Sequence, residues 1–412
     1  MDKGVRWRLS AMMFLQYMAW GTWYPVLSAY LERIGFNGNQ IGVIYSLLPL
    51  GCMIAPLLGG QLADRYVSTE KLLAILHLIG GLLLCLMAGV SGYGRLVPLM
   101  LAWSLVYAPT LALTNSITFQ HLPDAEKKFG LVRVFGTLGW IAAGLILTLL
   151  RKFWPEQQGL PGLAGADSLW LAGLFSLALG LFSFALPHTP PAKTGESPWA
   201  MLAALKLLRD PTFAIFIAIA FVVSTELMFY YVLTAPFLQS RGIASDNIPA
   251  VMTLAQAAEI GAMLALPLML GRWGLRKTMA LGILAWPIRY AIFASGAPLW
   301  LAVAALALHG LCYVCFLVAA FIYVDSVAPA GIRASAQGFI TFVTLGAGLF
   351  CGSRFAGWIR DIYTTQNLGG IEVNYQKVFL VPCVLTIICA AAFFLVFRNR
   401  PAVIGGPQRT AS

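Results

Sequence analysis

Long runs of apolar residues follow one another along almost the whole chain, with short polar gaps between them. A helix that crosses a membrane needs about 20 mostly apolar residues. A window of that length predicts twelve membrane-spanning helices, at residues 9–31, 41–63, 71–92, 97–119, 131–150, 168–187, 212–239, 247–270, 278–296, 299–324, 334–358 and 376–397. The first run is too long and too aromatic for a signal-peptide core, so we expect it to stay in the mature protein.

The composition agrees with this pattern and narrows the class of protein. Of the 412 residues 59% are hydrophobic and only 10% are charged, whereas a soluble domain carries about 25% charge. This excludes a soluble enzyme, a nucleic-acid-binding protein and a disordered scaffold. The net charge of +11 is spread over the polar gaps, so we assign it to membrane orientation and expect no nucleic-acid partner.

The basic residues predict which side of the membrane holds the chain ends. With twelve alternating spans both termini lie on one side, where eighteen of the 27 Lys and Arg fall, against seven on the other side. Basic residues concentrate on the cytoplasmic side. We therefore predict cytoplasmic termini and a multi-pass protein of a bacterial inner membrane, surrounded by the lipid bilayer.

The longest gap divides the twelve spans into six and six. It begins with a Pro-rich stretch, and its second part has the pattern of a short amphipathic helix on the membrane surface. We predict an N-terminal six-helix bundle (1–187), a cytoplasmic linker (188–211), a C-terminal six-helix bundle (212–397) and a cytoplasmic tail (398–412). Two such halves are typical of transporters built from repeats, with a substrate site near mid-membrane.

A short motif recurs in the two predicted halves. Residues 60–65 read Gly-Gln-Leu-Ala-Asp-Arg, which resembles the signature of the major facilitator superfamily, and residues 274–277 keep the Gly-x-Arg-Lys end of the same motif. The predicted fold class is therefore an all-α membrane protein with the major facilitator fold.

Two groups of polar residues within the spans are candidates for chemistry, because an ionisable residue at membrane depth is costly unless it faces a cavity or a partner. Glu259 lies one turn after Gln256, and a partly desolvated carboxyl there could exchange a proton. Arg133, Thr137 and Trp140 share one helix face. The alternatives are a carboxyl that serves only a hydrogen bond between helices and an arginine that anchors the cytoplasmic end of a span.

Further candidates come from the other spans. Gln16, Trp20 and Trp23 follow one face of the first span and fit a wall that stacks a flat ligand, although aromatic residues in spans are often packing residues or interface anchors. Candidate cavity residues elsewhere, each with packing as the alternative, are Asn115, Tyr231, His309 and Tyr313, and Glu226 is a second candidate for a proton site.

Several chemistries have no motif in this sequence. It contains no Gly-x-x-x-x-Gly-Lys-Ser/Thr loop, no His/Cys/Asp cluster with metal spacing and no Ser-centred elbow. We therefore expect no enzyme activity, no cofactor and no metal, and a gradient rather than ATP as the driving force.

At these residues the chain resembles the nucleoside:proton symporter family of the major facilitator superfamily. The resemblance runs over nearly the whole length and includes Gln-Ala-Ala-Glu at 256–259. Its more specific pieces are Arg-Val-Phe-Gly-Thr at 133–137 and Ile-Arg-Ala-Ser-Ala-Gln-Gly at 332–338. It implies a monomeric twelve-helix carrier that binds a nucleoside between two bundles and imports it with a proton by alternating access. Position by position it places nucleoside and proton contacts at Arg133, Thr137, Trp140, Gln256 and Glu259.

The resemblance weakens in the second half. Met228 and Tyr231 stand where the family has a Gln and an Asn, and Val314 and Leu317 stand where it has an Asp and an Asn. A site without a partner for a ligand hydroxyl discriminates poorly. The open alternatives are a carrier of another small polar solute, such as a sugar or an aromatic acid, a uniporter, and a membrane receptor without transport.

Overall fold

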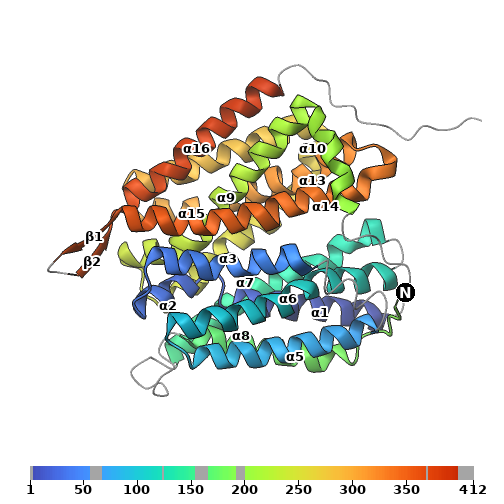
Figure 1. The fold of residues 1–412 in the computed structure, drawn as a ribbon, viewed down its shortest axis with the longest axis horizontal. Helices are drawn as coiled ribbons and strands as arrows, with labels where there is room; N and C mark the ends of the chain where they lie inside the picture. Colours follow the sequence, from blue (N-terminus) through green and yellow to red (C-terminus); the bar gives the residue numbers. More distant parts are fainter. Residues whose placement is uncertain are drawn as a thin grey trace, which may run out of the picture. The chain divides into compact units, whose positions relative to one another are not determined.

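The computed structural model describes residues 3–55, 67–122, 125–153, 166–191, 200–367 and 370–397. Its elements are helices apart from one two-stranded hairpin (Figure 1). In the described part, nine helices are long and apolar enough to cross a membrane: α3 (Gly38–Ala55), α5 (Thr69–Ala88), α6 (Tyr93–His121), α7 (Ala125–Phe153), α9 (Pro211–Ser240), α10 (Ile248–Ala294), α16 (Tyr375–Val396) and two composite helices at Leu299–Val327 and Ser335–Ile362. The apolar runs thus form membrane-length helices.

The remaining predicted spans form shorter helices, or two of them form one continuous helix. The first one is broken into α1 (Lys3–Gly21) and α2 (Leu27–Arg33), and α8 (Asp167–Ser183) has 17 residues. The two spans predicted at 247–270 and 278–296 lie in one continuous helical run, α10, where Gly274 breaks the helical backbone with a φ of 73°. That φ is left-handed and favours glycine. The break therefore falls where the motif of residues 274–277 begins.

The chain forms two compact units. Unit 1 comprises residues 1–196, 227–256 and 349–373, and unit 2 comprises residues 197–226, 257–348 and 374–412. The division into bundles at 1–187 and 212–397 stays a prediction. The Gly-Gln-Leu-Ala-Asp-Arg motif at 60–65 and the tail at 398–412 lie outside the described residues, as does part of the linker. A helix does occupy Ala200–Arg209, as a 3-10 helix.

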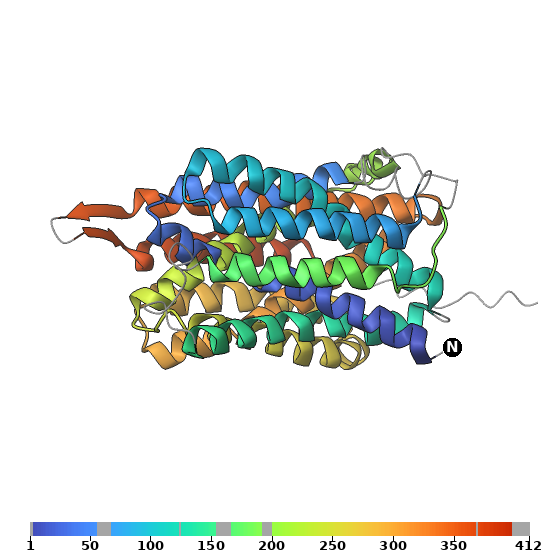
Figure 2. The same cartoon turned by 90° about the horizontal axis from the view of Figure 1, so that it is seen from below.

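Unit 1 has a core built from its helices near the N-terminus. In Figure 1, α5 packs along α8 and α6, and α1 packs along α7 and α8. The buried residues of this core include Leu9, Met13, Leu73, Leu113 and Val132. The same unit holds α15 (Leu349–Ile362), which lies beside α3 in both views (Figures 1 and 2).

Unit 2 contains two helices with widened turns. One runs through α11 (Leu299–Ala305), α12 (Leu308–Gly310), the π-helix η4 (Leu311–Val318) and α13 (Ala319–Val327). The other runs through η5 (Ala330–Ile332), α14 (Arg333–Thr341) and the π-helix η6 (Phe342–Gly348), after which the chain continues into α15 of unit 1. π-helical turns are rare in proteins, and a large share of those that exist lie at functional sites. Val314 in η4 is fully buried against Ala262 and Leu266 of α10.

A β-hairpin follows α15. It lies at the same end of unit 1 as α2 (Figure 2). Its strands β1 (Thr364–Asn367) and β2 (Gly370–Val373) pair antiparallel, with Thr364 opposite Val373 and Asn367 opposite Gly370. Gly370 has a φ of 119°, a conformation that glycine adopts without strain at such a turn.

Candidate functional site

Trp20, at the end of α1, lies at the centre of an aromatic cluster in unit 1. Its ring centroid is 5.3 Å from that of Trp140 on α7, 5.4 Å from Tyr24 and 6.1 Å from both Tyr17 and Tyr107. The indole Nε1 is buried and has no hydrogen-bond partner among the described residues. The cluster, which we call the Trp20 cage, thus combines several aromatic faces with an unused donor.

Two more predicted residues join the Trp20 cage at its edges. The Arg133 guanidinium lies over the Tyr17 ring, 4.0 Å from its centroid, a distance typical of a cation–π contact. Tyr231 packs edge-on against Tyr24 at 5.1 Å. The structure therefore brings Trp20, Trp140, Tyr231 and Arg133 together, although their segments are far apart in the sequence.

The close packing of Trp140 depends on a small residue. A Cβ added at Gly21 would lie 2.6 Å from the Trp140 ring, so only glycine lets the ring approach α1 this closely. On the same helix, a Cβ at Gly144 would lie 2.6 Å from the Thr253 methyl of α10. These glycines set the distances of α7 from its neighbours in unit 1.

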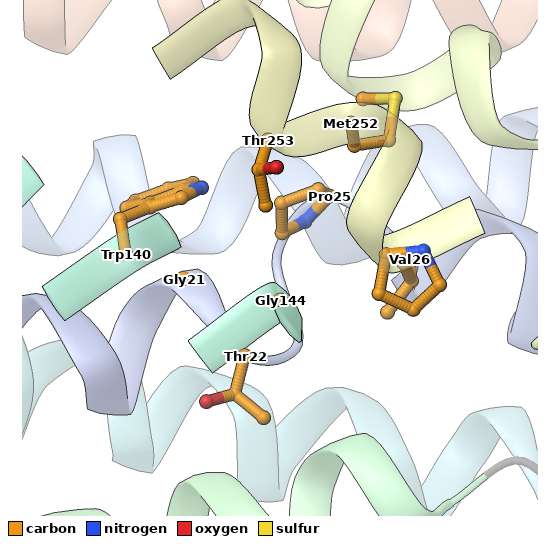
Figure 3. A pocket seen from close by; sticks show the side chains of 9 residues that line it. Gly21, Thr22, Pro25, Val26, Trp140, Gly144, Met252 and Thr253 are labelled. Carbon is orange, nitrogen blue, oxygen red and sulfur yellow. The ribbon is translucent and has the colours of Figure 1, made fainter. Parts of the chain in front are cut away.

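A pocket in unit 1 adjoins the Trp20 cage (Figure 3). It is lined by Gly21, Thr22, Pro25, Val26, Trp140, Gly144, Pro249, Met252 and Thr253. Trp140 belongs to both the cage and the pocket. The side chains that line the pocket are mostly apolar, and the hydroxyls of Thr22 and Thr253 donate to main-chain oxygens of their own segments.

Gln16 lies in the core of unit 1 and its amide is already engaged. Its Nε2 donates to Thr110 Oγ1 at 2.8 Å, and its Oε1 lies 2.7 Å from His77 Nε2. The other nitrogen of His77 lies 3.0 Å from Ser176 Oγ. Because Gln16 is fully buried in this network, ligand contact by Gln16 requires the network to open, and this role stays a prediction.

Sequence reasoning passed over His77 in favour of His309 as the histidine at membrane depth. His77 is 1% exposed on α5, between α1 and α8. The signal was present, since an ionisable ring within a long apolar run is unusual. Its two partners, Gln16 and Ser176, come from two other helices, and a single helix face does not reveal them.

Trp23 does not continue the helix face of Gln16 and Trp20, because α1 ends at Gly21. The Tyr45 hydroxyl donates to Tyr24 O at 2.7 Å and accepts from Ser28 N–H at 3.1 Å, which fixes the turn between α1 and α2. Trp23 is buried there with its ring centroid 5.0 Å from that of Trp103. The structure therefore places Trp23 in the packing around the Trp20 cage, and its binding role stays a prediction.

The remaining predicted residues of unit 1 are less engaged. Asn115 on α6 and Thr137 on α7 are half-buried. Gln256 is 5% exposed, and its Oε1 has no hydrogen-bond partner among the described residues. A buried acceptor of this kind is costly unless a ligand or water donates to it.

Unit 2 brings Glu259, His309 and Tyr313 close together. A Cβ at Gly310 would lie 2.7 Å from the Glu259 main-chain nitrogen, so α12 and α10 pack tightly beside Glu259. The rings of His309 and Tyr313 are stacked, with centroids 6.0 Å apart. Glu259 itself is half-buried.

Glu226 lies in another part of unit 2 and is fully buried on α9. The Tyr290 hydroxyl of α10 donates to its main-chain oxygen. Arg289, next to Tyr290, contacts His309. The Glu226 main chain is therefore linked through the Tyr290 hydroxyl to Arg289.

A set of contacts between distant segments of unit 1 was not predicted at all. We call Glu32, Arg360 and Asp361, with the main-chain N–H groups of Gly38 and Asn39, the Arg360 latch. Arg360 Nε donates to Glu32 Oε1 at 2.7 Å, and the Asp361 carboxylate accepts from the N–H groups of Gly38 at 2.6 Å and Asn39 at 2.8 Å. Asp361 thereby binds the N-terminus of α3, where four N–H groups lack helical partners.

The Arg360 latch is half-enclosed by protein. Burial raises the pKa of the Glu32 carboxyl, and the charge and hydrogen bond of Arg360 act in the opposite direction. One turn further along α3 from the latch, α3 and α15 approach closely, since a Cβ at Gly42 would lie 2.5 Å from Ser353 O.

A further link in unit 1 joins α7 to α10. The Ala250 N–H of α10 donates to Thr148 Oγ1 of α7 at 2.9 Å.

Comparison with known proteins identifies the family. The sequence model of the nucleoside H⁺ symporters matches residues 3–402. The chain belongs to the nucleoside H⁺ symporter family. YegT of Escherichia coli (strain K12) is 36% identical over 406 residues, which cover 95% of this chain and 93% of YegT.

Two further relatives, one of them with a solved structure, are similar to this chain over almost its whole length. The xanthosine permease of Escherichia coli (strain K12) is 29% identical and covers 95% of both chains. The crystal structure of the nucleoside transporter NupG has a TM-score of 0.84 at 28% identity, and the match covers 97% of this chain and 100% of NupG. Membership in this symporter family confirms the family and transporter class predicted from the sequence.

Proposed function

We propose that this protein imports nucleosides across a bacterial inner membrane by proton symport with alternating access. The observation that carries the proposal is the Trp20 cage within a chain that matches the nucleoside H⁺ symporter family over residues 3–402. The driving force would be the proton gradient, without a cofactor.

The proposed topology has twelve membrane crossings with both ends in the cytoplasm, in the major facilitator fold, and a monomer as the working unit. The nine long apolar helices support it, together with α8, the broken first span and the Gly274 break that divides α10 in two. The excess of Lys and Arg on the side of the termini supports the orientation.

In the proposed binding mode the Trp20 cage stacks the flat base of the nucleoside. Aromatic faces bind every base by stacking, a contact worth about 1–3 kcal/mol per base. The unused Trp20 Nε1 and Gln256 Oε1 supply a donor and an acceptor, and Arg133 supplies a cation at the edge of the cage. Thr137 and Asn115 are further candidates for polar contact, as are His309 and Tyr313 in unit 2.

Two carboxyls are candidates for the coupling proton, Glu259 and Glu226. Both lie in apolar helices, where an ionisable group marks a proton or substrate pathway more often than not. Glu259 would also accept hydrogen bonds from nucleoside hydroxyl groups.

The test is uptake of radiolabelled uridine and adenosine into proteoliposomes with an imposed pH gradient. We expect gradient-dependent accumulation by the wild-type protein. Trp140→Ala should lower uptake at low substrate concentration at least tenfold, because one stacked ring is lost. Trp358→Ala, a change at an exposed ring of α15, is the matched control and should retain uptake. Uptake of sugars or aromatic acids instead of nucleosides would overturn the proposal.

A further inference from the structure

The starting observation is a chain of contacts in unit 2 that links α9 to α10 and α12 at full burial. Tyr290 OH donates to the Glu226 main-chain oxygen and accepts from Arg289 Nη2 at 3.1 Å. Arg289 Nη1 lies 3.2 Å from His309 Nδ1. We call Glu226, Arg289, Tyr290 and His309 the Arg289 cluster. All four residues are fully buried.

The hydrogen bonds of the Arg289 cluster define its protons. Arginine stays charged in proteins and can only donate. His309 Nδ1 must therefore accept from Arg289, which leaves the ring proton on Nε2 and makes His309 neutral. The guanidinium is also held between aromatic faces, 4.8 Å from the centroids of Trp286 and Tyr290. The cluster thus holds one fixed positive charge.

The Glu226 side chain has few partners. Its Oε2 has no hydrogen-bond partner among the described residues, and Oε1 lies 3.2 Å from Thr225 Oγ1. The Thr225 hydroxyl also lies 2.6 Å from Val222 O and has only one proton to donate. If that proton goes to Val222 O, Thr225 can only accept from Glu226. This geometry fits a neutral carboxylic acid, which donates its own proton to Thr225.

An ionised Glu226 would fit this site badly. A buried carboxylate without hydrogen-bond donors costs several kcal/mol. In the described part of unit 2, the titratable groups close to Glu226 are Tyr290 and the thiol of Cys389 in α16. Tyr290 in turn has Arg289 and the thiol of Cys312 beside it. Glu259, by contrast, is half-buried and can hold its charge more readily.

We propose that Glu226 carries the transported proton, and that Arg289, Tyr290 and His309 position it. In the described state the proton is on the Glu226 carboxyl. When water reaches this carboxyl during the transport cycle, the O–H bond breaks, the proton passes to water and the carboxylate remains in the hydrated site, with the Glu226 main chain held by Tyr290. The inference rests on the proposed function, because the proton must be coupled to nucleoside movement.

The test compares Glu226→Gln with the wild type in proteoliposomes that contain a pH-sensitive dye. Three readouts are needed: gradient-driven uridine accumulation, uridine-dependent proton influx, and uridine counterflow, which needs no net proton movement. We expect Glu226→Gln to lower accumulation at least tenfold and to lose proton influx, with counterflow within about twofold of the wild type. Glu70→Gln is the matched control, since Glu70 is a buried carboxyl paired with His188 in unit 1, and it should keep the wild-type ratio of protons to uridine.

The outcomes separate this inference from the proposed function. If the wild-type protein shows no uridine counterflow, the proposed function is wrong. If Glu226→Gln keeps the proton influx of the wild type, this inference alone is overturned. If Glu226→Gln loses counterflow as well, Glu226→Asp decides, because it keeps a titratable carboxyl: restored proton influx supports the inference, and none contradicts it. Tyr290→Phe removes the hydroxyl beside Glu226, and as a positioning change it should shift the pH profile of uptake while counterflow persists.

Discussion

Two buried arginines in this protein are held in different ways. Arg360, 4% exposed in unit 1, donates to the Glu32 carboxylate at 2.7 Å and lies 3.4 Å from Asp361 Oδ1. Arg289, fully buried in unit 2, is held by the Tyr290 hydroxyl, the His309 ring and two aromatic faces. Carboxylates contact the first charge directly, and a hydroxyl, an imidazole nitrogen and two aromatic faces contact the second.

The difference teaches what each site can do. An arginine between two carboxylates fixes the segments that carry them, because removing one partner leaves an uncompensated charge. An arginine that donates to a hydroxyl and to an imidazole nitrogen belongs to a buried hydrogen-bond network, and such a network can position a group that gains and loses a proton. We therefore read the Arg360 latch as a structural link and the Arg289 cluster as a site for a proton.

The largest expected difference comes from replacing each arginine by methionine. Arg360→Met leaves Glu32 and Asp361 without their cation and should lower the free energy of unfolding by about 2 kcal/mol, less than for a fully enclosed pair because the Glu32 side chain keeps 22% exposure. Arg289→Met removes the donor to His309 Nδ1 and to the Tyr290 hydroxyl, and it should impair gradient-driven uptake. Thermal melting in detergent and uridine accumulation measure both effects.

The comparison has its own control within the latch. The double variant Glu32→Gln/Arg360→Met should recover part of the lost stability, because the unpaired carboxylate is gone. A lower stability in the double variant than in Arg360→Met, or unchanged gradient-driven uptake in Arg289→Met, would contradict the contrast between the two sites.

A smaller effect is expected for Asp361→Asn. This change keeps the shape of the side chain but removes the negative charge from the N-terminus of α3, where it accepts from Gly38 and Asn39. We expect a loss of about 1 kcal/mol in the free energy of unfolding. Asn39→Ala removes only an exposed side-chain bond to Asp361 and should be near neutral. Equal losses in the two variants would argue against a role for the charge.

The sequence predicted the membrane helices well because their signal is local. Runs of about 20 apolar residues exist before any packing is known, and they match the long helices of the structure. The break between Gly21 and Leu27 was not predicted, although Pro25 within it disfavours a continuous helix. The Tyr45 hydroxyl of α3 fixes the turn at this break, and that contact is not visible in the sequence. The helix face assigned to Trp23 failed for this reason.

The candidate site was predictable in part. Arg133, Trp140 and Trp20 stood out because polar and aromatic groups on one helix face are visible in the sequence. The Arg360 latch was not visible, since Glu32 and Arg360 are 328 positions apart and each looks like an ordinary charge at the end of a span. His77 was missed because its partners, Gln16 and Ser176, come from other helices.

The most direct test of proton-coupled nucleoside transport is a measurement of proton movement driven by the nucleoside alone. Wild-type proteoliposomes with equal pH inside and outside, and a pH-sensitive dye in the lumen, receive uridine from outside. The account predicts that the lumen acidifies as uridine enters, and that a proton ionophore abolishes the pH change. Uridine entry without any change of lumenal pH would contradict it.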